Sequence, residues 1–124
     1  MSAQPENASE LFDMLLPLGL QAYPDKAREV NGIFLFKLEG EGGGKWTLNC
    51  LVSPPKIFKG EPNETDLPNT CTIELSHEDF KKLLQDPNEG MGLYFAGKLA
   101  ITGKTEIATR LAIFFDITRP NPIQ

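Results

Sequence analysis

The first stretch of the sequence that could do chemistry is GEGGGKW at residues 40–46, where glycines lead into a lysine and the chain's single tryptophan. Glycine-rich loops hold phosphate when they join a strand to a helix, because backbone N–H groups and the helix dipole then converge on the anion. Residues 46–52 instead alternate apolar and polar side chains, a period that predicts a strand. A Walker loop would also need glycine in place of Glu39 and a hydroxyl side chain in place of Trp46. The stretch therefore predicts a hairpin turn, with positive φ angles at Gly40, Gly42, Gly43 and Gly44.

The single histidine, His77, is the next residue that could act chemically. A catalytic base needs an identifiable partner, and a zinc site needs further histidines or cysteines at ligand spacing; neither accompanies His77. We therefore expect a solvated side chain at a helix N-terminus. Glu61, Glu64 and Asp66 lie in a proline-rich stretch and are most simply a solvated charge cluster, with a metal or partner site as the alternative. These residues predict no catalytic group, no cofactor and no metal ligand.

Composition limits the function classes further. The chain has 124 residues and a formal net charge of −5, and its basic residues are scattered, which argues against nucleic-acid binding. This length is enough for one domain with a substantial core. There is no membrane-spanning apolar run, no signal peptide pattern and no peroxisomal tripeptide in the final letters NPIQ, so we expect a cytoplasmic protein. Cys50 and Cys71 lie on apolar faces of predicted strands and are expected to be reduced core residues rather than a disulfide.

The elements that position these residues follow from periodicity, beginning with helices near the N-terminus. Asn7 and Glu10 have the spacing of a capping box before an amphipathic helix, which Pro17 should interrupt or kink. Asp25 is expected to cap a second, short helix that ends near Gly32.

The central part of the chain predicts strands, and the C-terminal part alternates strands with helices. Ser76 should cap a helix of two to three turns that Pro87 ends, and a short helix should follow. The last helix, within 105–115, is expected to carry an ion pair between Glu106 and Arg110. Strands are expected in the hairpin at 33–52, at a short edge segment, 56–59, and at 70–76 and 97–103. This order predicts an α+β fold.

Three sequence stretches resemble the sterol carrier protein 2 family, and the resemblance spans about residues 8–116. The most specific is F-x-G-K-L-x-I-x-G from Phe95 to Gly103, preceded by T-I-x-L-S-x-x-D-F from Thr72 to Phe80. The GGGKW hairpin and the N-terminal LFDMLLPLGLQAYPDKA are also similar to family members. The resemblance implies a five-stranded mixed sheet covered by helices on one face, with an apolar tunnel between the sheet and the last helix.

The same resemblance implies a non-catalytic lipid-binding or transfer domain at residues 8–117, between a flexible N-terminus, 1–7, and a flexible tail, 118–124. Family ligands are fatty acids, acyl-CoA thioesters, sterols and phospholipids, and transient contact with a membrane or an acyl-lipid enzyme is implied as well. Several members have a glutamine in the last helix where this chain reads RLAIFF. The more apolar tunnel mouth favours an acyl chain as the ligand. Nothing in the sequence predicts an oligomeric state.

The candidate ligand-binding residues are the large apolar side chains of the sheet and the helices. Those on the sheet are Phe34, Phe36, Trp46, Leu48 and Ile73, and those on the helices or above the tunnel are Leu83, Phe95, Ile107, Leu111 and Phe114. Periodicity does not separate the wall of a cavity from ordinary core, so each of these residues has a packing role as its alternative. Two other functions stay open: an accessory or protein-interaction subunit without a cavity, and a hydrolase or metal-dependent enzyme that uses residues 61–66 with His77.

Overall fold

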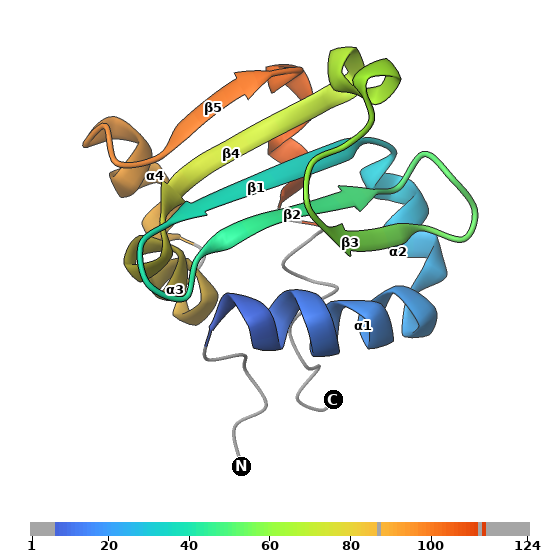
Figure 1. The fold of residues 1–124 in the computed structure, drawn as a ribbon, viewed down its shortest axis with the longest axis horizontal. Helices are drawn as coiled ribbons and strands as arrows, with labels where there is room; N and C mark the ends of the chain where they lie inside the picture. Colours follow the sequence, from blue (N-terminus) through green and yellow to red (C-terminus); the bar gives the residue numbers. More distant parts are fainter. Residues whose placement is uncertain (1–6, 87, 112, 114–124) are drawn as a thin grey trace.

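The computed structural model describes residues 7–86, 88–111 and 113, and its centre is a five-stranded sheet (Figure 1). The strands are β1 (Ile33–Glu39), β2 (Gly44–Asn49), β3 (Lys56–Lys59), β4 (Thr70–Ser76) and β5 (Ala100–Gly103). Their order across the sheet is β3-β2-β1-β4-β5. The central strand β1 pairs antiparallel with β2 and parallel with β4, so the sheet is mixed. The mixed five-stranded sheet, the hairpin and the short edge strand β3 are thus confirmed.

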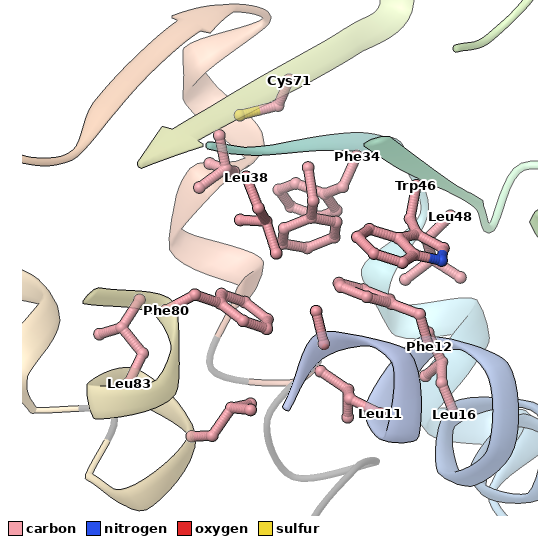
Figure 2. Packing of buried hydrophobic residues seen from close by; sticks show 14 of the residues in the cluster. Leu11, Phe12, Leu16, Phe34, Leu38, Trp46, Leu48, Cys71, Phe80 and Leu83 are labelled. Atoms are coloured by element: carbon pink, nitrogen blue, oxygen red, sulfur yellow. The ribbon is translucent and has the colours of Figure 1, made fainter. Parts of the chain in front are cut away.

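Helical segments precede, interrupt and follow the strands. They are η1 (Glu10–Leu15), α1 (Leu16–Ala22), α2 (Pro24–Val30), η2 (Glu64–Asn69), α3 (His77–Gln85), α4 (Glu89–Phe95) and η3 (Thr105–Arg110). The segment η1 is a π-helix, and η2 and η3 are 3₁₀-helices. In Figures 1 and 2, α1 and α3 lie beneath the same face of the sheet. The α+β class is confirmed.

The first helix begins as predicted but does not stop at its proline. The Glu10 N–H donates to Asn7 Oδ1 at 2.8 Å, which caps the N-terminus. The Leu16 N–H then donates to the Leu11 carbonyl five residues back, as in a π-helix. Pro17 falls in the first turn of α1, where a missing N–H costs little. The chain therefore stays helical through Pro17, and the hydrogen-bond pattern changes from π to α there.

The predicted cap of the second helix is wrong. Pro24 occupies the first turn of α2, and its N-cap is Tyr23, without a side-chain hydrogen bond. Proline's fixed φ already suits a first helical position. Asp25 therefore lies inside the helix, where it forms an ion pair with Arg28. The helix ends at Val30, two residues before the expected end near Gly32.

The hairpin turn has three of its four glycines at the expected positive φ. These are Gly40 (+94°), Gly42 (+82°) and Gly44 (+153°). Gly43 does not have a positive φ, so that part of the prediction is wrong. A Cβ atom on Gly43 would lie 2.2 Å from the Leu38 carbonyl oxygen, and glycine is required there because the two backbones approach so closely.

The main core fills the space between the sheet and the helices (Figure 2). The ring of Phe12 stacks on that of Trp46 with centroids 4.9 Å apart, and its centroid lies 5.0 Å from that of Phe36 and 5.6 Å from that of Phe80. These aromatic rings join the first helix, the hairpin and α3. Leu35 alternates with Phe36 on β1 and is also buried, so both faces of this central strand are covered.

The C-terminal part of the described chain differs from prediction in one strand boundary and in one ion pair. The strand β5 begins at Ala100, later than the expected 97, and Leu99 just before it is buried. The expected Glu106–Arg110 pair is wrong: Glu106 lies 3.7 Å from Lys104, whereas Arg110 donates to backbone carbonyls at the end of α2. In a 3₁₀-helix, residues four apart no longer share a face, which removes the reason for the pair.

Candidate functional site

The predicted ligand-binding residues of the sheet are all buried and lie together. Phe34, Phe36, Trp46, Leu48 and Ile73 are each at most 2% exposed and belong to one core cluster. Trp46 fixes its ring further, because its Nε1–H donates to Asp13 Oδ1 at 3.2 Å, and the Lys59 ammonium lies 5.4 Å from the ring centroid. Of these side chains, Phe36 and Trp46 contact Phe12 of the first helix.

The predicted ligand-binding residues outside the sheet differ in their burial. Leu83 and Ile107 are buried in the same cluster, and Leu111 is half-buried and packs against it. Phe95 is 76% exposed, so the structure does not bring it together with the others. Phe114 lies outside the described residues. Ligand binding by this set stays a prediction.

His77 is not the solvated side chain expected from the sequence. It is 5% exposed. Its Nε2 accepts the Ala8 N–H at 3.1 Å, and its Nδ1 lies 2.9 Å from the Glu41 carbonyl oxygen. Because a backbone N–H can only donate, Nε2 carries no proton, and Nδ1–H donates to Glu41. Both ring nitrogens thus bond to backbone, which joins α3, the hairpin turn and the start of the first helix.

The acidic residues 61–66 do not form a metal site among the residues that the structure describes, where no suitable group of three His, Cys, Asp or Glu side chains occurs. Glu61 bonds to Lys45, with Nζ and Oε2 2.6 Å apart. This hydrogen bond and the lysine charge lower the pKa of the Glu61 carboxyl.

Both cysteines are buried free thiols, as the apolar alternation predicts. Burial raises the pKa of Cys50 to about 12 and that of Cys71 to about 11. A thiolate is the reactive form, so neither side chain is suited to act as a nucleophile.

A groove of about 620 Å³ lies between the helices α1 and α2 and the segment that connects β2 to β3. Its lining is mostly apolar, with a few polar and basic side chains. The lining residues are Pro17, Leu20, Gln21, Pro24, Arg28, Val52, Ser53, Pro54, Pro55, Lys56, Ile57 and Phe58. Such a volume and lining are typical of sites for small apolar ligands.

A second, smaller pocket of about 310 Å³ adjoins the end of α2 and has a polar lining. It is lined by Asn31, Gly32, Leu51, Asn69, Lys104, Glu106, Ile107 and Arg110. Ile107 alone belongs to the set predicted from sequence, and it contributes to the core as well.

Sequence reasoning missed the groove because prolines in a sequence predict breaks and turns rather than the lining of a cavity. Pro17 and Pro24 come from the helices, and Pro54 and Pro55 from the connection after β2. The apolar segment 56–59 between turn-forming residues was the available signal. It predicted the edge strand, but only the fold places the helices beside it.

Of the helices that the structure describes, none has both the length and the hydrophobicity to span a membrane. A family model described as "SCP-2 sterol transfer family" matches residues 12–116. Curated relatives include hydroxysteroid dehydrogenase-like protein 2 of Rattus norvegicus, 29% identical over 84 residues, and sterol carrier protein 2 of Homo sapiens, 29% identical over 87 residues. Each match covers 68% of this chain but only 16% and 15% of the respective relative, so the chain corresponds to a small part of these proteins.

Solved structures show the same fold. The palmitated SCP2L2 of Aedes aegypti superposes with a TM-score of 0.65 at 16% identity, covering 93% of this chain and 99% of that one. The apo sterol carrier protein 2 of Yarrowia lipolytica superposes with a TM-score of 0.62 at 17% identity, covering 90% and 86%.

Proposed function

Because the chain belongs to the SCP-2 sterol transfer family, we propose that it is a non-catalytic lipid-binding domain whose ligand is a lipid with an acyl chain. The family match over residues 12–116 is the observation that carries this proposal, since it covers nearly every described element. The family supports lipid binding and transfer in general, and the acyl chain is our own choice among lipid classes.

The groove beside α1 and α2 is the proposed seat of the acyl chain. Its apolar side chains, among them Leu20, Val52 and Ile57, would remove methylene groups from water. Each buried methylene contributes about 0.8 kcal/mol, so a twelve-carbon chain gains roughly 9 kcal/mol before the cost of ordering it. That gain is enough for binding without a specific contact at every carbon.

The space beneath the last helix, predicted from sequence, is the alternative seat. Leu111 would then contact the ligand, whereas Val52 would not. Because Leu111 is half-buried and Val52 is 39% exposed, an acidic side chain is tolerable at either position in the folded protein. The two variants Val52→Asp and Leu111→Asp therefore separate the two locations.

The test is a titration of the delipidated full chain with a fluorescent fatty acid, followed by displacement with laurate. We expect saturable binding of one ligand per chain. Val52→Asp should weaken it at least about tenfold, because the new carboxylate must be desolvated against the acyl chain. Met91→Asp is the matched control: Met91 is 66% exposed and does not line the groove, so binding should not change.

Absence of saturable binding to wild type, together with no lipid co-purifying from cells, would refute the lipid-binding proposal. Loss of binding in Leu111→Asp but not in Val52→Asp would instead move the ligand from the groove to the space beneath the last helix.

A further inference from the structure

The polar pocket has a lining rich in hydrogen-bond donors. Asn31 follows α2, Asn69 ends η2, and Lys104 and Arg110 flank and end η3. Three segments that are distant in sequence therefore contribute two amides, an ammonium and a guanidinium to one pocket. Glu106 is the acidic residue in this lining.

Arg110 is held in place by the backbone. Its Nη1 donates to the carbonyl oxygens of Val30 at 3.1 Å and Asn31 at 3.0 Å. Among the described residues, its Nε and Nη2 have no hydrogen-bond partner. A guanidinium fixed on one side in this way keeps donors available for an oxyanion and loses little side-chain entropy when it binds one.

Lys104 adds a second positive charge that is weakly neutralised. Its Nζ lies 3.7 Å from Glu106 Oε2, and the Glu106 side chain is 71% exposed, so this pair is loose and hydrated. The two cations and one carboxylate leave the lining with a surplus positive charge, in a chain whose formal net charge is −5. The charge of this pocket thus complements an anion although the whole protein is acidic.

The polar pocket and the apolar groove are lined by residues that are close together in the chain. Leu51 lines the pocket, and the next residue, Val52, lines the groove. Likewise, Arg28 in the last turn of α2 lines the groove, and Asn31 just after this helix lines the pocket. The residues that line the apolar groove are therefore only three positions from those of the cationic pocket at the end of α2, and one position from them at Leu51 and Val52.

We propose that the polar pocket binds the anionic head group of the lipid, a carboxylate or a phosphate, while its acyl chain lies in the adjacent groove. This inference rests on the proposed function, because it assumes that an acyl chain occupies the groove. Oxyanion oxygens accept hydrogen bonds from Lys104 and from the remaining donors of Arg110, and Asn31 and Asn69 offer amide N–H groups. The site then prefers an ionised amphiphile to a neutral one of equal chain length.

The test compares laurate with dodecanol, which has the same chain length and no charge, on the delipidated full chain at pH 7.5. Wild type should bind laurate more tightly than dodecanol, and added salt should reduce the difference. Lys104→Gln should weaken laurate binding about two- to fivefold, as for a partly exposed charge pair, and leave dodecanol binding unchanged. Lys98→Gln removes the same charge from an exposed site that lines neither cavity and serves as the control.

Inorganic phosphate is titrated separately to distinguish a lipid head group from a free anion. Phosphate alone should bind more weakly than laurate, since it lacks the acyl chain. Equal binding of laurate and dodecanol, or equal effects of Lys104→Gln and Lys98→Gln, would overturn the head-group assignment while leaving lipid binding intact. Phosphate that binds as tightly as laurate and responds to Lys104→Gln would also overturn it, because the pocket would then be a site for free anions.

Discussion

The contact between Gly42 and His77 allows a prediction that separates backbone strain from side-chain packing. A Cβ atom on Gly42 would lie 2.6 Å from Cε1 of the His77 ring. At Gly40, in the same turn, a Cβ atom would meet nothing within 4 Å. Both glycines have positive φ, +82° and +94° respectively. Alanine at either position therefore has a similar backbone cost, and only Gly42→Ala adds a collision.

The magnitudes follow from these two terms. A left-handed backbone conformation costs a non-glycine residue about 1–2 kcal/mol, which is the expected loss of unfolding free energy in Gly40→Ala. Overpacking adds about 1–3 kcal/mol, so Gly42→Ala should lose about 2–5 kcal/mol. The ring of His77 has no easy escape, because moving it would break its hydrogen bonds to Ala8 and Glu41.

Replacing His77 with alanine tests the cause of the difference. His77→Ala alone should lose about 2–4 kcal/mol, because the buried Ala8 N–H loses its acceptor and Glu41 loses a hydrogen bond. In this background the collision is absent. Gly42→Ala and Gly40→Ala should then agree within about 0.5 kcal/mol, the usual limit for independent sites.

The assay is urea unfolding of each variant, monitored by the fluorescence of the single tryptophan. Should His77→Ala be too unstable, His77→Gln offers a more flexible side chain without a ring, which can still accept a hydrogen bond from Ala8. Equal losses in Gly40→Ala and Gly42→Ala, or a difference between them that persists without His77, would refute the packing explanation.

Two further predictions concern the buried thiols and the cap of α3. Burial raises the pKa of Cys50 to about 12 and of Cys71 to about 11, above the ordinary 9.0, so the folded state holds these protons more tightly. Their contribution to stability is complete below pH 9 and is lost as pH rises toward 12; urea midpoints should fall over this range, less steeply when both are alanine. Ser76→Ala should lose about 1 kcal/mol in urea unfolding, because the Asp79 N–H donates to Ser76 Oγ at 3.0 Å. Asn88→Ala is the control for Ser76→Ala, since the Asn88 side chain makes no capping hydrogen bond in α4. Equal losses of unfolding free energy in these two variants would contradict the capping argument. An equal fall of the urea midpoint with pH in wild type and in the variant without cysteines would contradict the thiol argument.

Features set by neighbouring residues could be predicted from the sequence. The cap at Ser76 depends on a hydrogen bond with Asp79, three residues further along the chain. The apolar residues Cys71 and Ile73, two positions apart, show which side of β4 faces the core. The hairpin follows from its glycines and the strands that flank them. In each case the interactions that stabilise the feature lie within one turn or one strand, so the local sequence is enough to predict it.

Features set by distant residues could not be predicted in this way. His77 is buried because Ala8 and Glu41 approach it from other parts of the chain. Arg110 bonds to the end of α2 rather than to its helical neighbour Glu106 for a similar reason. The exposure of Phe95 could not be predicted from the sequence either, because an aromatic residue is expected in the core unless the position of α4 is known.

The candidate site shows the same division. The apolar residues of the sheet were predicted to be inside, and they are, but periodicity does not tell a packed wall from an open one. The groove depends on the approach of α1 and α2 to the connection after β2, and none of these segments has a sequence pattern that specifies its neighbour. The polar pocket combines four such segments and is harder still to foresee.

The position of β1 at the centre of the sheet has a consequence for the order of folding. Its pairing with β2 joins Leu38 to Gly44 across a short turn, whereas its pairing with β4 joins Ile33 to Thr70 and must close the whole intervening chain. Local pairs have a small loop-closure entropy, and distant parallel pairs a larger one. The three-stranded meander of β1, β2 and β3 should therefore form early, and docking of β4 should limit the folding rate. Lengthening the connection 60–63 would then slow folding more than it accelerates unfolding.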